Sequence, residues 1–318
     1  MPVVGLDEIV AAEHRIRALV RETPVERSEV FSARVGGEVL LKLENLQHTG
    51  SFKVRGASNK ILGLDDDRNA PVVAASSGNH GAAVAYVLRN VGRKGIVFMP
   101  GKASALKVEN VRRLGAEVAF FGDDEAVAES HARGWAAERG LTFVSPYNDA
   151  AIVAGQGTLG LEAWRQAAGG IDNVFVSVGG GGLIGGVALY LKAMKPGIRI
   201  IGCSPAASPV MAQSVRAGKI LDLPSSPTLS DGTAGGVEAD TITLALCRDF
   251  VDHWVEVSEE AIAEAMRLFI DAHHMLLEGA GGVAIAGALG AGEAWTTGRS
   301  LIVICGANIS RSTLKSVL

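Results

Sequence analysis

The chain has 318 residues, of which 48% are hydrophobic, and a formal net charge of −4. Charges of both signs are spread along it without a basic block, which argues against nucleic acid and against a membrane surface as partners. Its apolar stretches are too short or too often broken by glycine to span a bilayer, and its first residues lack the pattern of a signal peptide.

Short apolar runs alternate with helical patterns through most of the chain. In chain order, we expect strands at residues 39–41, 72–75, 96–99, 117–121, 141–144, 174–178, 198–203 and 301–305. Helices are expected from about residue 55, at 81–91, 103–114, 124–139 and 183–194, and after a cap at Ser258. This order predicts an α/β fold with βαβ units and largely parallel sheets. Residues 205–236, which include Pro-Ser-Ser-Pro, predict an irregular connection.

The length and the order of elements favour two domains. Residues 49–144 contain a compact βαβ set of their own and are expected to form a smaller, mobile domain. Residues 1–48 and 145–318 would form the larger one. A ligand would then bind in the cleft at the carboxyl ends of the strands.

Three cysteines, Cys203, Cys247 and Cys305, are too few and too far apart for a disulfide framework or a CxxC zinc site. Such sparse cysteine usage is typical of a reducing compartment, so we expect a cytoplasmic protein. Cys305 ends an apolar run and would be either a buried inert thiol or a weak neutral partner for a cofactor ring.

Lys53 lies in Thr-Gly-Ser-Phe-Lys-Val-Arg-Gly, between an expected strand and an expected helix. Desolvation lowers the pKa of a lysine, and a neutral amine can attack a carbonyl group. The commoner alternative for such a residue is a solvated loop lysine.

Four consecutive glycines, Gly179 to Gly182, follow the expected strand at 174–178 and precede a helix. Glycines there allow backbone N–H groups to approach an anion, and the helix N-terminus favours negative charge, which predicts a phosphate site. The alternative is a tight turn without a ligand. The run also matches a dinucleotide fingerprint, but the next strand ends in Cys-Ser-Pro without the carboxylate that a ribose needs, so a nicotinamide site is disfavoured.

A second donor-rich turn, Ser-Ser-Gly-Asn-His from Ser76 to His80, follows the expected strand at 72–75. Successive N–H groups with the Ser and Asn side chains are suited to hold a carboxylate. The alternative is an ordinary helix N-cap region. Within it, His80 is expected to make a structural hydrogen bond.

Taken together, segments 42–56, 76–81, 155–158, 178–183 and 278–281 resemble the fold-type II pyridoxal 5′-phosphate enzymes, specifically the serine/threonine dehydratase and serine racemase family. The likeness covers nearly the whole chain in the right order, whereas the cysteine synthase branch looks less similar. The resemblance implies two open, mostly parallel sheets flanked by helices, as in the β subunit of tryptophan synthase. It also implies a homodimer.

The resemblance implies roles for individual residues. Lys53 would carry the cofactor as a Schiff base and act as the catalytic base. The cofactor would be held by Phe52 against the ring, Asn79 at the 3′-oxygen, Cys305 at the pyridine nitrogen, Glu278, and the phosphate-binding residues Gly179, Gly180, Gly181, Gly182 and Leu183. The amino-acid substrate would contact Ser76, Ser77, Gly78, Asn79, His80 and Gln156.

The implied activity is a dehydratase, or ammonia-lyase, that converts a β-hydroxy amino acid such as L-threonine or L-serine into a 2-oxo acid and ammonia. Because Cys305 carries no negative charge, the ring would be a weaker electron sink than one facing an Asp, which favours quick loss of a β-hydroxyl group. In the racemase branch, a serine at the place of Ser77 resembles the acid/base of the opposite ring face; alternatively, its hydroxyl binds the substrate carboxylate or caps a helix.

Three other functions stay open: a serine, threonine or hydroxyaspartate racemase, a dehydratase of a hydroxylated diamino acid from compatible-solute breakdown, and a non-catalytic binding protein. Tyr147 and Asn148 are expected near the side-chain pocket by resemblance. Relatives activated by a divalent cation supply carboxylates just after the strand expected at 198–203, where this chain has Ser204, Ser208 and Val210. We therefore expect no metal at that place.

Overall fold

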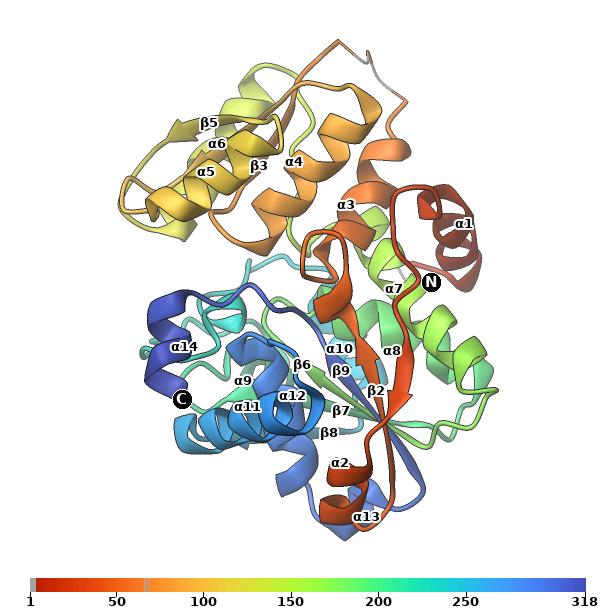
Figure 1. Cartoon of the computed structure of the whole chain (residues 1–318). Coiled ribbons are helices and arrows are strands. Elements are labelled where there is room, and N and C mark those ends of the chain that lie inside the picture. Colours follow the sequence, from red (N-terminus) through yellow and green to blue (C-terminus); the bar gives the residue numbers. More distant parts are fainter. Residues whose placement is uncertain (1–3, 66, 68) are drawn as a thin grey trace.

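The structure, a computed structural model, describes residues 4–65, 67 and 69–318, and its strands form two separate sheets (Figure 1). The larger sheet has the order β1-β2-β9-β6-β7-β8, with bounds Val25–Arg27, Glu38–Leu43, Arg299–Ile304, Asn173–Ser177, Arg199–Pro205 and His253–Val257. The pairing of β1 with β2 is antiparallel and the pairings from β2 to β8 are parallel. The smaller sheet has three parallel strands, β3 Val72–Ala75, β4 Gly95–Met99 and β5 Glu117–Phe120. The predicted α/β class is confirmed.

Helices flank both sheets, and the smaller sheet with α4, α5 and α6 forms the upper lobe in Figure 1. The first seven helices are α1 Leu6–Ile16, α2 Glu29–Val35, α3 Lys53–Leu62, α4 Asn79–Val91, α5 Ala105–Arg113, α6 Glu125–Glu138 and α7 Ala150–Gln166. The next seven are α8 Gly182–Met194, α9 Val210–Ala217, α10 Thr243–Phe250, α11 Glu259–His273, α12 Gly279–Gly290, α13 Glu293–Thr296 and α14 Arg311–Val317. Short 3₁₀ turns are η1 Glu44–Leu46 and η2 Asp231–Thr233.

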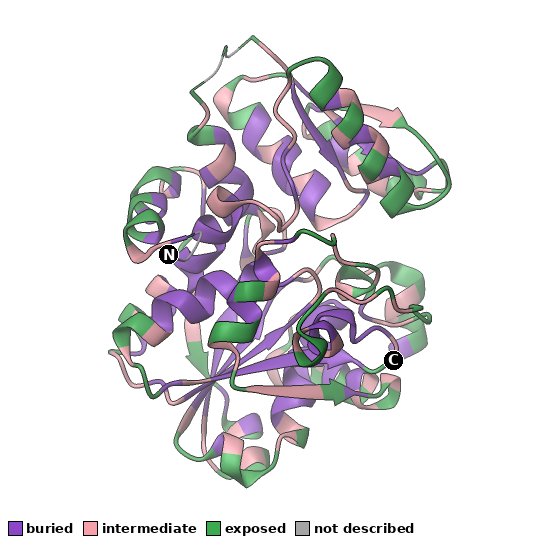
Figure 2. Cartoon of the chain, turned by 180° about the vertical axis from the view of Figure 1, so that it is seen from behind, coloured by how far each residue is buried: buried purple, intermediate pink, exposed green. Residues whose placement is uncertain are grey.

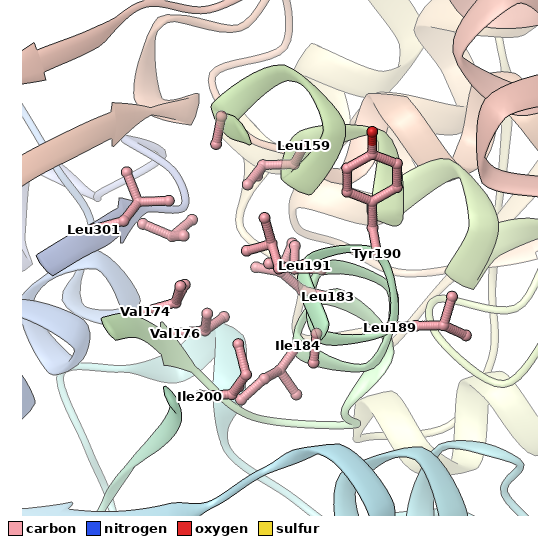
Figure 3. Packing of buried hydrophobic residues seen from close by; sticks show 14 of the residues in the cluster. Leu159, Val174, Val176, Leu183, Ile184, Leu189, Tyr190, Leu191, Ile200 and Leu301 are labelled. Atoms are coloured by element: carbon pink, nitrogen blue, oxygen red, sulfur yellow. The ribbon is translucent and has the colours of Figure 1, made fainter. Parts of the chain in front are cut away.

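The core of the larger sheet is built around α8 and α12, whose residues are apolar almost all round and therefore buried (Figure 2). Strands cover one side of each of these helices, and other helices cover the opposite side. Neither helix therefore needs a polar face toward solvent. Figure 3 shows side chains of α8 beside strand residues of one cluster, including Leu183, Ile184, Leu191, Val174, Val176, Ile200 and Leu301. This packing fixes the start of α8, where the glycine run lies, relative to the ends of the strands.

Two expectations about local structure are wrong. Residues 141–144 do not form a strand: Phe143 makes an isolated parallel bridge with Val73, so the backbone pairing of this segment with the smaller sheet is limited to Val73. The region 205–236 is not irregular throughout, because it contains α9 and η2. The stop at Gly218, which has a φ of 70°, ends α9 in the left-handed conformation that glycine adopts readily.

Helix α7 was not predicted, since its glycines lower helix propensity. These glycines are needed because α7 packs closely against α3 and α8. A Cβ on Gly155 would lie 2.7 Å from Gly56 Cα, and one on Gly186 would lie 2.3 Å from Val153 O. The two neighbouring helices therefore approach α7 at backbone distance, which only glycine permits at these positions.

The strands of the smaller sheet all lie within residues 72–120, inside the segment predicted for the smaller domain. The domain limits at 49 and 144 and the mobility of this segment stay predictions. Among the described residues, no helix combines the length and the apolar character needed to cross a membrane.

Candidate active site

Lys53 is the first residue of α3 and its amine faces the backbone of a distant loop. Its Nζ donates a hydrogen bond of 2.9 Å to Pro146 O and lies 5.2 Å from the centroid of the Phe52 ring. Burial lowers the pKa of the Lys53 amine to about 8, although the negative charge of Glu129 opposes this shift. The site therefore holds an amine that is neutral more often near pH 7 than an ordinary lysine is.

The segment before Lys53 is pinned to the end of β9. Ser51 forms an antiparallel bridge with Gly306, and Phe52 N donates to Cys305 O at 3.1 Å. Cys305 is thereby placed next to the lysine, and the Ser177 hydroxyl at the end of β6 lies 3.5 Å from its sulfur. Burial raises the pKa of the Cys305 thiol to about 12, so the group stays neutral.

The glycine run forms the entry to α8. The N–H of Gly185 makes the first bond of the helix to Gly181 O at 2.9 Å, so the N–H groups of residues 182–184 have no acceptor within the helix itself. A Cβ on Gly180 would lie 2.4 Å from the ring of Tyr147, and one on Gly179 would lie 3.0 Å from Thr233 Cα. Tyr147 and Thr233 thus pack directly against Gly180 and Gly179, where a residue with a side chain would not fit.

Two consecutive residues, Pro146 and Tyr147, contact both Lys53 and the glycine run. Pro146 accepts the hydrogen bond from Lys53, and the next residue, Tyr147, packs over Gly180 and Gly182. The Tyr147 hydroxyl in turn accepts from Glu238 N at 2.9 Å. The Lys53 amine and the glycine run therefore belong to one continuous site. Tyr147 and Asn148, expected near the substrate side chain, bond through their side chains to residues 238–242 and through their backbone N–H groups to Ser145 Oγ.

The turn between β3 and α4 contributes the remaining polar groups. The hydroxyl of Ser76 accepts from Gly78 N at 3.0 Å, which shapes the turn. The ring Nε2 of His80 hydrogen-bonds Val144 O at 2.8 Å, and burial lowers the pKa of this imidazole to about 3. His80 is therefore neutral and donates to the carbonyl, as expected for a structural role.

Ser77 has a partner that the sequence did not indicate. Its backbone N–H donates to Glu125 Oε1 at 3.2 Å, and its hydroxyl donates to the same oxygen. Glu125 is the first residue of α6, 48 positions away. Nothing local in the sequence connects the two, because the contact depends on how α6 packs against β3.

Asn79 is held in a network with Glu278 and Asn308. Its Nδ2 donates to the Glu278 carboxylate at 2.8 and 3.0 Å, and its Oδ1 accepts from Asn308 Nδ2 at 2.6 Å. Burial raises the pKa of Glu278 to about 7, against the hydrogen bonds from Asn79 and Asn308 N. The network joins the start of α4 to the start of α12, so Asn79 and Glu278 are brought together as the site requires.

Gln156 is the predicted site residue that lies apart from these contacts. It is buried on α7, and its Oε1 accepts from Gly56 N at 3.2 Å. This contact joins α7 to α3 instead of facing the turn at Ser76–His80. Its role in substrate binding stays a prediction that the geometry does not favour.

A cluster of buried charges supports the helix that carries Lys53. The guanidinium of Arg55 lies 2.8 Å from Glu44 Oε1 and 2.7 Å from Glu162 Oε2, and Lys42 Nζ lies 2.9 Å from Glu162 Oε2. All four side chains are fully buried. Two positive charges face two negative ones, so the first turn of α3 is tied to β2, η1 and α7 without net charge.

Comparison with known proteins agrees with this geometry. The family model described as "Pyridoxal-phosphate dependent enzyme" matches residues 16–306. An L-threonine ammonia-lyase of Thermotoga maritima is 38% identical over 99% of this chain and 78% of the relative. A serine racemase of Oryza sativa subsp. indica is 37% identical over 97% of this chain and 92% of the relative. The solved structure of maize serine racemase superposes with a TM-score of 0.92 at 36% identity, covering 99% of this chain and 96% of that one.

Proposed function

The chain belongs to the family of pyridoxal-phosphate-dependent enzymes, and from this premise we propose that it is a dehydratase of a β-hydroxy amino acid. The substrate would be L-threonine, L-serine or a close analogue, and the products a 2-oxo acid and ammonia. The observation that carries this proposal is the amine of the half-buried Lys53, which bonds Pro146 O and has its pKa lowered to about 8, beside the neutral thiol of Cys305.

The residues of the site fit pyridoxal 5′-phosphate. The loop from Gly179 to Gly182 suits a phosphate, because it leads into α8, where the N–H groups of residues 182–184 have no acceptor within the helix. The Lys53 amine suits an aldehyde. Asn79, Cys305 and Phe52 would contact the ring. When bound, this cofactor withdraws electrons from the α-carbon of the amino acid attached to it. Glu278 acts through Asn79 by orienting its amide.

Lys53 moves the proton. At neutral pH an amine with a pKa near 8 exists in both protonation states, so it can accept the α-proton of the substrate and later return a proton to the departing hydroxyl group. The carbonyl of Pro146 holds the amine in position through one hydrogen bond.

The neutral thiol of Cys305 sets the reaction type. With a pKa raised to about 12, it supplies no negative charge at the end of β9. Negative charge developing at the substrate is therefore best relieved by prompt loss of the β-hydroxyl group, which favours elimination. The turn Ser76–His80 would bind the substrate carboxylate with the donors of Ser77 and the N-terminus of α4.

A racemase is the second candidate, and the hydroxyl of Ser77 is the observation that favours it, together with the similarity to serine racemases. A dehydratase of a hydroxylated diamino acid is the third candidate, for which no contact in the structure argues specifically. We also propose a cytoplasmic homodimer in which residues 49–144 move relative to the rest of the chain.

A panel of β-hydroxy amino acids tests the proposal. The protein loaded with pyridoxal phosphate should release a 2-oxo acid from at least one of them, and assays of stereochemistry should detect no inversion. Lys53→Ala should abolish turnover and the visible absorbance of lysine-bound cofactor. Full turnover by Lys53→Ala would refute the proposed mechanism.

A further inference from the structure

Both donors of Ser77 are occupied by a carboxylate that belongs to the chain itself. The backbone N–H of Ser77 points to Glu125 Oε1 at 3.2 Å and Oε2 at 3.4 Å, and the Ser77 hydroxyl donates to Oε1. Ser77 is buried beneath this contact, whereas Glu125 is an exposed residue at the start of α6. Two oxygens of one carboxylate thus face the turn proposed to bind the carboxylate of the substrate.

We propose that Glu125 is an internal competitor that fills the substrate-carboxylate subsite until an amino acid displaces it. This inference rests on the proposed function of the same site. The side chain of Glu125 presents the same chemical group as the α-carboxylate of an amino acid, to the same donors. Two negative carboxylates repel each other and cannot share one N–H and one hydroxyl, so binding of the substrate requires Glu125 to leave.

Glu125 is able to leave without disturbing the helix that carries it. The N-terminus of α6 is capped by its neighbour, Asp124, whose side chain accepts from Val127 N at 2.9 Å. Within residues 4–65, 67 and 69–318, no cation is described in an ion pair with Glu125. Rotation of one exposed side chain into solvent therefore frees both donors of Ser77.

The contact would make the subsite selective. A ligand binds a site that is only partly open with an affinity reduced by the open fraction. An amino acid offsets this reduction because its amino group would also bond to the cofactor aldehyde in exchange for the Lys53 amine, which is released. A carboxylate without an amino group has no such second attachment. Glu125 would therefore exclude simple carboxylates from the site more strongly than it excludes amino acids.

Binding of propionate to the cofactor-loaded protein tests this inference. Calorimetric titration should show that Glu125→Ala and Glu125→Gln bind propionate at least about threefold more tightly than the unmodified chain. The KM for the β-hydroxy amino acid should fall in the same variants. Glu138→Gln is the matched control, because Glu138 lies on the same helix, has a side chain 75% exposed and contacts only Arg139 among its described ion pairs.

If the Glu125 variants and Glu138→Gln bound propionate with equal affinity, the inference would be overturned. The change in net charge, and not the contact with Ser77, would then explain any gain in propionate affinity. Loss of stereochemical inversion in the Glu125 variants, with unchanged propionate binding, would also overturn it and assign the contact to proton transfer by Ser77. The titration needs no turnover. A protein that forms no 2-oxo acid would refute the proposed function and leave the propionate comparison interpretable.

Discussion

The amine of Lys53 is hydrogen-bonded to the carbonyl oxygen of Pro146 at 2.9 Å, 93 residues further along the chain. This bond connects the start of α3 to the peptide that precedes Tyr147, whose ring covers the glycine loop. A change in the position of either partner would therefore alter both the Lys53 side and the glycine-loop side of the proposed cofactor site.

The pH dependence of cofactor uptake should reveal the lowered pKa of Lys53. Only the neutral amine attacks an aldehyde, and burial brings the pKa of this amine to about 8, from an ordinary value of 10.5. Stopped-flow absorbance should show that the rate at which cofactor-free protein takes up pyridoxal phosphate rises with pH and levels off above about pH 8. A rate that still climbs steeply at pH 10 would contradict the burial of this amine.

Gly180→Ala should weaken cofactor binding, because the new methyl group would lie 2.4 Å from the Tyr147 ring. Overpacking of this kind costs about 1–3 kcal/mol, and if this cost falls on the cofactor-bound state, cofactor affinity should drop by about fivefold to 150-fold. Equilibrium dialysis measures the affinity. Gly134→Ala on α6 is the control: a Cβ there meets nothing within 4 Å, so the substitution should stabilise the helix by about 0.5–1 kcal/mol without affecting the cofactor.

Ser77→Ala separates the two leading functions. A dehydratase needs the Ser77 hydroxyl only as a donor to the substrate carboxylate, so the variant should keep 2-oxo acid formation with a KM raised about tenfold. Any inversion of chirality seen in the unmodified chain should disappear, and Ser77→Thr, which keeps a hydroxyl group, should preserve it. Inversion that survives in Ser77→Ala would exclude Ser77 as the acid/base of a racemase.

The sequence predicts those candidate site residues that have a recognisable pattern in the few residues around them. Lys53 and the glycine run could be found because each lies at the junction of a strand and a helix and is flanked by small residues. The pairing of Asn79 with Glu278 spans 199 positions, and that of Ser77 with Glu125 spans 48, so neither has a local signature. Only the packing of whole elements determines which distant carboxylate reaches each turn.

The same limit explains two of the differences between the predicted and the observed fold, the strand expected at residues 141–144 and the unpredicted helix α7. Residues 141–144 have the apolar pattern of a strand, but after Phe143 bridges Val73 the chain turns away toward Pro146, where it meets Lys53. The sequence of helix α7 contains glycines that lower its helix propensity, so it gives little local signal for a helix. Packing against neighbouring helices stabilises it instead. Tertiary contact overrides the local preference in both places.

Glu162→Gln should lower the stability of the protein, and the loss should shrink in acid. Burial alone would raise the pKa of Glu162, but Arg55 and Lys42 lower it to about 2, from an ordinary value of 4.5. A carboxyl group whose pKa is lower in the folded chain stabilises the fold above the unfolded pKa, and this contribution disappears as the pH falls through the folded pKa. Removing the charge leaves two buried cations with one carboxylate, at a cost of about 3–5 kcal/mol near pH 7.

Urea unfolding of both proteins at several pH values measures this difference. The gap between the unmodified chain and Glu162→Gln should be constant above about pH 5 and should narrow between about pH 4.5 and pH 2. Glu138→Gln, at an exposed position, should unfold at nearly the same urea concentration as the unmodified chain throughout. A gap that does not depend on pH would mean that Glu162 contributes through its shape and hydrogen bonds, and not through its charge on the helix that carries Lys53.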